Sequence, residues 1–208
     1  MGHNNIIDQV EQYYTEKVRL HGATARGVDW NSPESQGLRF AQLLKVRDHE
    51  APFTINDYGC GYGALADYLT RAGCTFRYYG FDVSPQMIAE AKALHQAMEQ
   101  VTFVSAEEAL TEADYTVASG IFNVKLQSSG PDWEQYILSR LDVVNGISRK
   151  AFGFNMLTKY SDPELMRSHL YYGDPLFFFD YCKTKFSRFV SVLHDYPLYE
   201  FTILVTKE

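Results

Sequence analysis

The stretch DYGCGYGALADYL (residues 57–69) places glycine at every second position and then changes to a helical pattern. It follows a short run with strand character, so the glycines lie between a predicted strand and a predicted helix. Gly59, Gly61 and Gly63 let the backbone approach a ligand closely, and a helix that begins after such a turn directs free N–H groups at that ligand. The stretch therefore predicts a ligand-binding turn.

Strand and helix patterns alternate around this turn. The strand candidates before the C-terminal region are residues 52–58, 75–82, 101–104, 114–120 and 150–157, and helical stripes mark residues 87–98 and 133–144. This alternation is typical of a parallel sheet with helices on both faces. Two further strand candidates, residues 188–196 and 199–207, are separated only by Pro197 and Leu198, which is too short for a helical crossover. We expect them to pair antiparallel.

The first 50 residues have a different pattern. Apolar residues at helical spacing predict an amphipathic helix: Ile6, Val10, Tyr13, Tyr14 and Val18. Ser32 and Pro33 are typical of the start of a second helix, which we expect to run to about Arg47. The chain of 208 residues suits a single domain, with residues 1–50 as a helical cap and residues 51–208 as the core. Residues 21–30, which include Trp30, are interpreted either as a lid or as a surface connection.

The composition limits the class of protein. A formal net charge of −7 gives no basic surface for a nucleic acid, so none is expected as a partner. No apolar run approaches the length of a membrane span and no signal pattern is present, so we expect a cytoplasmic protein without a membrane contact. The cysteines lack the spacing of a metal site or disulfide framework, and no bound metal is predicted: Cys60, Cys74 and Cys182.

Two classes of cofactor use a glycine-rich turn of this kind. Gly59, Gly61 and Ala64 satisfy the dinucleotide pattern G-x-G-x-x-A, and Asp82 follows at about the spacing of a ribose-binding acid. Asp57, however, lies two residues before the first glycine, where a carboxylate suits a cationic group better than a pyrophosphate. The turn alone leaves both classes open.

The motifs around the turn resemble those of the class I, Rossmann-like S-adenosylmethionine-dependent methyltransferases. INDYGCGYG (55–63) matches the strand, acid and glycine turn of their first motif, and YGFDVSPQMIAEA (79–91) matches the acid and helix start of their second. The resemblance implies a doubly wound α/β fold with a seven-stranded sheet in the order 3-2-1-4-5-7-6. The sheet would be mostly parallel, with the antiparallel strand of the C-terminal pair inserted, and S-adenosylmethionine would be the cofactor.

The same resemblance implies roles for individual residues. The turn from Gly59 through Cys60 and Gly61 to Gly63 would hold the methionine and ribose region, with Asp57 near the amino group. Asp82 would bind the ribose hydroxyls, since one carboxylate can accept both of them in charge-assisted hydrogen bonds. The remaining implied contacts are Val83 and Met87 near the adenine, Ala106 or Glu107 near its amino group, and Ser119 in the loop that faces the methyl group.

The sequence contains no recognisable catalytic triad. Methyl transfer from a sulfonium depends mainly on holding a nucleophile close in a dry pocket, so a dedicated base is optional. The candidates, each of which also has a structural interpretation, are Asn123, Asn155, Tyr160 and His21. His194 is expected at the sheet edge, too far from the methyl group.

The aromatic segment 160–181 could wall an acceptor pocket or close the core. We predict an S-adenosylmethionine-dependent methyltransferase that acts on a small-molecule acceptor. The alternatives are an NAD-dependent oxidoreductase and a non-catalytic nucleotide-binding module. The acceptor atom and the oligomeric state stay open.

Overall fold

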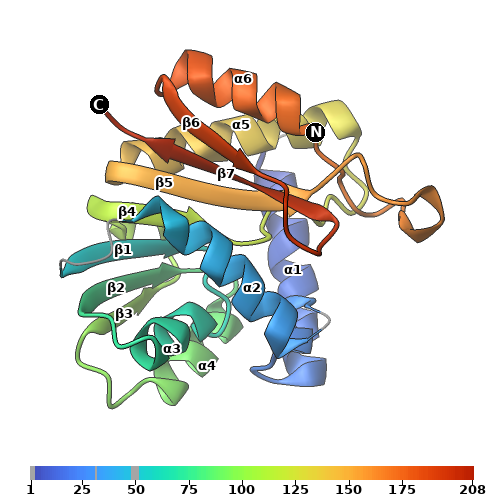
Figure 1. The fold of residues 1–208 in the computed structure, drawn as a ribbon. Helices are drawn as coiled ribbons and strands as arrows, with labels where there is room; N and C mark the ends of the chain where they lie inside the picture. Colours follow the sequence, from blue (N-terminus) through green and yellow to red (C-terminus); the bar gives the residue numbers. More distant parts are fainter. Residues whose placement is uncertain (1–2, 31, 48–51) are drawn as a thin grey trace.

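The computed structural model describes residues 3–30, 32–47 and 52–208, and a seven-stranded sheet in the order β3-β2-β1-β4-β5-β7-β6 forms its centre (Figure 1). Strands β3, β2, β1, β4 and β5 pair parallel, whereas β7 pairs antiparallel to both β5 and β6. The predicted fold class and strand order are confirmed. The strands are β1 (Phe53–Tyr58), β2 (Phe76–Phe81), β3 (Val101–Val104), β4 (Ala113–Ala118), β5 (Ser148–Leu157), β6 (Phe189–Leu193) and β7 (Glu200–Thr206).

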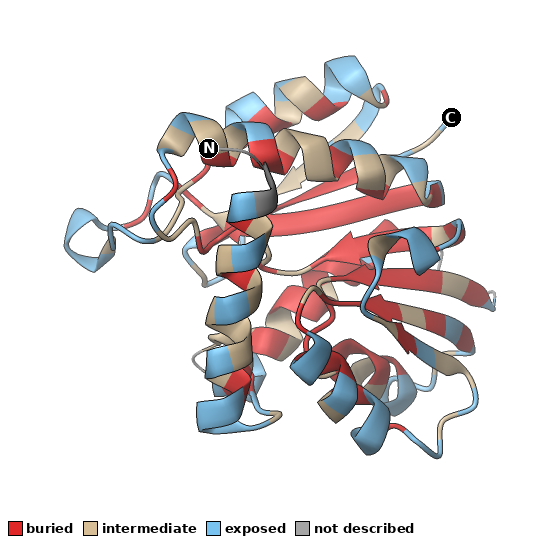
Figure 2. Cartoon of the chain, turned by 180° about the vertical axis from the view of Figure 1, so that it is seen from behind, coloured by how far each residue is buried: buried red, intermediate tan, exposed pale blue. Residues whose placement is uncertain are grey.

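Helices cover both faces of the sheet. One face carries α2 (Pro33–Leu43), α3 (Ala64–Arg71) and α4 (Pro85–Leu94), and the other carries α5 (Gly130–Gly146) and α6 (Pro175–Lys185). Helix α1 (His3–His21) crosses the carboxyl ends of the strands (Figure 1). A hydrophobic cluster fills each interface, so the central strands are buried while the outer sides of the helices are exposed (Figure 2). The edge strands β3 and β6 are more exposed. Short 3₁₀ helices form at η1 (Ala25–Val28), η2 (Leu44–Val46), η3 (Glu107–Ala109) and η4 (Pro163–Leu165).

The predicted helix starts are confirmed by their capping hydrogen bonds. The Ser32 hydroxyl accepts a hydrogen bond from the N–H of Ser35 at 3.2 Å, and Pro33 is the first residue of α2. The Ser84 hydroxyl accepts one from the N–H of Met87 at 3.3 Å at the start of α4. Each cap satisfies a backbone donor that the helix itself leaves unpaired.

One local prediction is wrong and one helix was not predicted. The helical stripe over residues 87–98 extends too far, because α4 ends at Leu94, which is exposed, and the buried His95 ring bonds to the carbonyl of Ala91. The helix without a prediction is α6 (Pro175–Lys185), which begins at the Asp174 cap.

Only part of the predicted cap covers the carboxyl ends of the central strands. Helix α1 and residues 25–30 lie there, whereas α2 packs on the sheet face as part of the hydrophobic core. Residues 1–2, 31 and 48–50 of that stretch lie outside the described residues. The division into a cap and a core within a single domain therefore stays a prediction.

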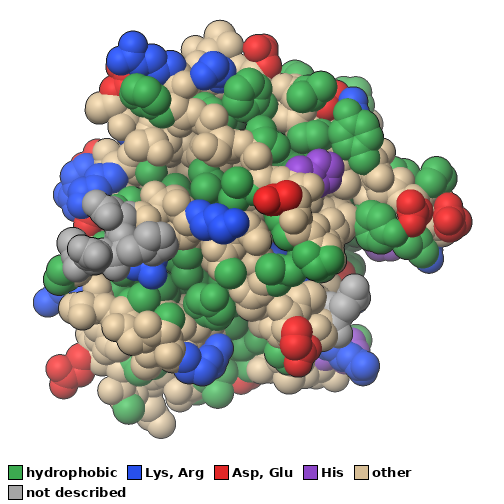
Figure 3. Space-filling model, in the orientation of Figure 1, with side chains coloured by type: hydrophobic (Ala, Val, Ile, Leu, Met, Phe, Trp, Pro, Cys, Tyr) green, Lys and Arg blue, Asp and Glu red, His purple; other side chains and the backbone are tan. Residues whose placement is uncertain are grey.

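The surface carries both signs of charge. On the face drawn in Figure 3, acidic and basic side chains lie in separate small groups between hydrophobic ones. In the part of the chain that the structure describes, no helix is both long and apolar enough to cross a membrane.

Candidate functional site

The glycine turn after β1 has the backbone geometry that its sequence predicts. Gly59, Gly61 and Gly63 have φ angles of 86°, 52° and 87°, in the left-handed region that favours glycine. The N–H groups of Gly59 and Cys60 both donate to the carbonyl of Phe81, at 2.7 and 2.8 Å. These bonds hold the turn against the end of β2.

Two buried carboxylates flank this turn. Asp57 on β1 accepts a hydrogen bond from the Tyr78 hydroxyl at 2.7 Å, and Asp82, directly after β2, accepts bonds from the N–H groups of Gly61 and Ser84 at 2.9 Å each. Burial raises the pKa of Asp57 to about 7 and that of Asp82 to about 6, although these hydrogen bonds oppose the shift. Neither carboxylate has a cationic side chain as its hydrogen-bond partner in the described structure, so a bound cation or hydroxyl would stabilise the charged forms.

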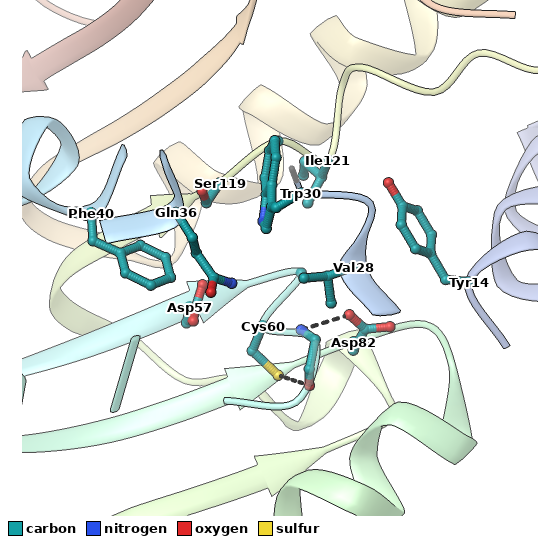
Figure 4. Close-up of a pocket in the computed structure, with 13 residues that line it drawn as sticks. Tyr14, Val28, Trp30, Gln36, Phe40, Asp57, Cys60, Asp82, Ser119 and Ile121 are labelled. Carbon is teal, nitrogen blue, oxygen red and sulfur yellow. Dashed lines mark hydrogen bonds between the residues drawn. The ribbon is translucent and has the colours of Figure 1, made fainter. Parts of the chain in front are cut away.

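A cavity of about 50 Å³ lies between the glycine turn and the loop after β4, and we call it the inner cavity (Figure 4). The hydroxyl of Ser119 lies in its wall, is buried, and has no hydrogen-bond partner among the described residues. Burial raises the pKa of the Cys60 thiol well above its usual value. The lining residues are Tyr14, Val28, Trp30, Gln36, Phe40, Asp57, Gly59, Cys60, Gly61, Asp82, Ser119, Gly120 and Ile121.

Side chains from the N-terminal segment fill much of the space at this position. A Cβ atom on Gly61 would lie 2.6 Å from Cγ1 of Val28, and one on Gly120 would lie 2.1 Å from the Trp30 ring. Val28 and Trp30 therefore sit directly on the two glycines, between the turn and the loop after β4 (Figure 4). Their position makes the inner cavity small.

A larger pocket of about 440 Å³ adjoins the inner cavity, and Gly59 and Asp82 line both. Three residues predicted near the adenine lie in its wall: Val83, Ala106 and Glu107. The Glu107 carboxylate accepts hydrogen bonds from the Tyr58 hydroxyl and, at 2.8 Å, from Nη1 of Arg140. We call this space the side pocket.

A third space of about 260 Å³, which we call the outer pocket, lies on the other side of Trp30. Asn123 is in its wall, and its side-chain oxygen accepts a hydrogen bond from the N–H of Leu157 at 3.0 Å. The lining residues are Tyr14, Val28, Asp29, Trp30, Arg39, Gly120, Asn123, Val124, Leu157, His169, Leu170 and Glu200.

Two residues that the resemblance assigned to the cofactor lie outside these three spaces. Met87 is 1 % exposed and packs in the core, and Gly63 caps the start of α3. A Cβ atom on Gly63 would lie 2.7 Å from the Phe103 ring, so packing alone accounts for this glycine.

The structure also separates the four catalytic candidates. Asn123 is the one that lines the outer pocket. Asn155 is fully buried, and its side-chain oxygen accepts the N–H of Gly120 at 2.7 Å, so it positions the loop after β4. Tyr160 is 58 % exposed and packs near the His194 ring. His21 lies in a surface pocket with Lys17 and Arg26, which shares Asp29 and Trp30 with the outer pocket, but His21 itself does not line the outer pocket.

Sequence reasoning did not identify most of the residues that line these spaces, among them Tyr14, Arg39 and Glu200. Tyr14 on α1 lines all three, and burial raises its pKa well above the usual value. In the sequence, Tyr14 stands out only by its helical spacing, which predicts packing and not a place in a site. Arg39 and Glu200 form an ion pair in the wall of the outer pocket, although 161 residues separate them, so no local motif relates one to the other.

Within residues 3–30, 32–47 and 52–208, no three His, Cys, Asp or Glu side chains are grouped so that they could hold a metal ion.

Comparison with known proteins identifies the family. Residues 55–143 match the family model described as "Methyltransferase domain". The chain is 52 % identical over 164 residues to "Putative methyltransferase Rv1506c" of Mycobacterium tuberculosis, a match that covers 79 % of this chain and 99 % of the relative.

Solved structures share the fold at low sequence identity. The N-methyltransferase NodS of Bradyrhizobium japonicum WM9, bound to S-adenosyl-L-homocysteine, is 13 % identical with a TM-score of 0.67, over 95 % of this chain and 98 % of that one. Magnesium protoporphyrin IX methyltransferase of Synechocystis PCC 6803 is 15 % identical with a TM-score of 0.64, over 99 % of both chains. The 52 % identical relative, the matching family model and the confirmed strand order together show that the chain belongs to the class I, Rossmann-like methyltransferase family.

Proposed function

We propose that this methyltransferase transfers the methyl group of S-adenosylmethionine to a small-molecule acceptor. The observation that carries the proposal is the pair of buried carboxylates, Asp57 and Asp82, on either side of the glycine turn at the carboxyl ends of β1 and β2. Two acids at this point suit a ligand that has both a cationic amino group and vicinal hydroxyls. A pyrophosphate would bring negative charge to the same place.

The residues present fit this cofactor. Asp82 can accept the ribose hydroxyls, and the unpaired Ser119 hydroxyl can bond to the amino-acid end beside Asp57. The side pocket offers apolar contact from Val83 and a carboxylate from Glu107 for the adenine. When bound, S-adenosylmethionine supplies a methyl group on a positively charged sulfur, so the acceptor displaces a good leaving group.

The methionine end of the cofactor needs more room than the inner cavity has. Val28 and Trp30 must therefore move off Gly61 and Gly120 when the cofactor enters. The two side chains would then lie over the cofactor, where they would exclude water from the reacting atoms.

The size of the neighbouring space supports a small molecule as acceptor. The outer pocket, of about 260 Å³, shares the walls of Tyr14, Val28, Trp30 and Gly120 with the inner cavity. Among the structural neighbours, one is named for magnesium protoporphyrin IX, which is itself a small molecule. An acceptor in the outer pocket would reach the methyl group over Gly120 once Trp30 has moved.

Two measurements test the proposal. Calorimetry should show binding of S-adenosyl-L-homocysteine and none of NAD, and S-adenosylmethionine with a labelled methyl group should label a compound in a small-molecule extract. Binding of NAD alone would favour the oxidoreductase, and cofactor binding without turnover on any extract would favour the non-catalytic module. Asp82→Asn, which weakens the ribose contact, serves as the control for both signals.

A further inference from the structure

A buried ion pair with one unused donor forms part of the outer pocket. Nε of Arg39 on α2 donates to both carboxylate oxygens of Glu200 on β7, at 3.0 and 2.8 Å, and Nη2 donates at 2.6 Å. Arg39 is 6 % exposed and Glu200 is 1 % exposed. Nη1 of Arg39 is buried and makes no hydrogen bond to any described residue. A buried donor without a partner is unfavourable, and most such groups in proteins are paired.

The Trp30 ring covers this guanidinium group. Cζ of Arg39 lies 3.9 Å from the centroid of the ring, which also rests on Gly120. Trp30 lines both the inner cavity and the outer pocket. The movement of Trp30 that makes room for the cofactor therefore uncovers Arg39 at the same time.

The rest of the outer pocket limits what could bond to Arg39. Its walls are mixed: Val124, Leu157 and Leu170 are apolar, and the other lining side chains include polar ones, namely Asp29, Asn123 and His169. Glu200 already neutralises the guanidinium, so a full negative charge on the ligand would meet no net positive charge from this pair. An uncharged oxygen can accept the remaining N–H donors without that penalty.

We propose that the outer pocket is the acceptor subsite, and that it selects a small uncharged molecule whose oxygen accepts a hydrogen bond from Nη1 of Arg39 after Trp30 has moved. This inference rests on the proposed function, since it identifies the outer pocket as the acceptor side of the same site. It also gives an order of events: the cofactor uncovers the donor, and the acceptor binds to it afterwards.

The probes are four single-ring compounds: benzamide, benzoate, benzylamine and toluene. Dissociation constants are measured by ligand-observed NMR on the free protein and on its complex with S-adenosyl-L-homocysteine. In the complex, benzamide should bind more tightly than the other three by about fivefold or more, the effect of one hydrogen bond. The free protein should show no such preference. In Trp133→Phe, the Trp30 indole N–H signal should shift on addition of benzamide, which locates the probe.

Two variants test the ion pair in opposite directions. Arg39→Lys keeps a cation for Glu200 but removes Nη1, so the preference for benzamide should disappear. Glu200→Gln leaves the guanidinium with a net charge, so the preference should move from benzamide toward benzoate. A complex that does not prefer benzamide, or a folded Arg39→Lys variant that still does, overturns the proposal. If Arg39→Lys fails to fold, Glu200→Gln decides alone: an unchanged ratio of the dissociation constants of benzamide and benzoate in this variant overturns the proposal.

A third variant separates this proposal from the proposed function. Trp30→Ala uncovers Arg39 without a cofactor, so the free variant should prefer benzamide, and Trp30→Ala with Arg39→Lys should not. If S-adenosyl-L-homocysteine does not bind at all, the proposed function fails, and this pair of variants still decides whether the outer pocket recognises an oxygen. No preference in free Trp30→Ala would contradict the subsite.

Discussion

The Asp82 carboxylate accepts a hydrogen bond from the N–H of Gly61 at 2.9 Å, so the acid at the end of β2 also shapes the glycine turn after β1. Its other oxygen accepts the N–H of Ser84 at the same distance. One side chain thus fixes the turn and the start of α4 and presents a carboxylate to the inner cavity. If Asp82 binds the ribose as we propose, binding and stability are coupled at this residue.

Asp82→Asn should lower both the stability of the protein and its affinity for the cofactor. The amide keeps one acceptor oxygen and turns a donor toward a backbone N–H, so a charge-assisted hydrogen bond worth about 1.5 to 3 kcal/mol is lost. We expect the affinity for S-adenosyl-L-homocysteine to fall at least about tenfold by calorimetry. In urea titrations near neutral pH the free energy of unfolding should fall by less than the bond is worth, because the burial that raises the pKa of Asp82 to about 6 already disfavours the charged carboxylate. Asp67→Asn, at a partly exposed acid beside His95, is the control and should leave this affinity unchanged. Lost stability with intact affinity would restrict Asp82 to the structural role.

The stability of the protein without cofactor should depend on the charge of Asp57. Its pKa is raised from 3.8 to about 7, first by burial and then by the Asp82 charge, against the Tyr78 hydrogen bond. The folded state therefore binds more protons than the unfolded state between these values. The stabilising contribution is complete below the unfolded pKa and is lost as the pH rises through the folded pKa.

Asp57→Asn isolates this effect. From about pH 4.5 to about pH 7.5, the free energy of unfolding of the natural chain should fall relative to that of the variant, as measured by urea titration at each pH. Asp114→Asn is the matched control. Although burial opposes the shift, hydrogen bonds from Thr54 and Lys150 lower the pKa of Asp114 to about 2, so its contribution is lost only at more acidic pH. A difference between the natural chain and Asp57→Asn that does not change with pH would contradict the raised pKa.

Gly61→Ala should be destabilising for two separable reasons. The φ of 52° strains any side chain, at about 1 kcal/mol, and the new methyl group would meet Val28. Gly73→Ala has a similar φ of 70° with no atom within 4 Å of the added Cβ, so it measures the strain alone. Gly61→Ala should cost more than Gly73→Ala, and Val28→Ala should relieve the excess in the double variant. Equal costs in urea titrations would mean that Val28 does not rest on the turn.

Trp30 should report the entry of the cofactor. The sequence has two tryptophans, and Trp133 is 1 % exposed with its indole N–H bonded to the carbonyl of Phe122 at 2.8 Å. In Trp133→Phe, S-adenosyl-L-homocysteine should shift the remaining emission and change its quenching by acrylamide, because Trp30 leaves Gly120. Trp30→Phe should show neither change. If neither the Trp30 emission nor its quenching changes at saturating ligand, Trp30 does not move when the cofactor binds.

The sequence predicts the sheet well because its signals are local. Alternating strand and helix patterns, the glycine turn, and the caps at Ser32 and Ser84 each depend on a few neighbouring residues. Even the polar Asn56 in β1 has a clear place in the structure, where its amide donates to the backbone carbonyls of Thr111 and Ile147. These bonds satisfy the side-chain nitrogen, whereas the buried side-chain oxygen has no hydrogen-bond partner among the described residues.

The outer pocket was not predictable in this way. Arg39 and Glu200 meet only because α2 packs near β7, and Tyr14 reaches the site because α1 crosses the ends of the strands. A related limit applies to the catalytic candidates, which stay predictions: the sequence predicts that a residue follows a strand, but not whether its side chain turns outward, as that of Tyr160 does, or into the core, as that of Asn155 does.

The sequence separation of the Arg39–Glu200 pair also bears on biosynthesis. Residues 161 positions apart must meet to close this wall, and loop closure over such a distance is entropically costly and slow. During translation the first helices leave the ribosome long before β7 does, so α2 must wait for its buried partner. The outer pocket is thus among the last parts of the protein that can take shape, because its wall is incomplete until β7 has been made.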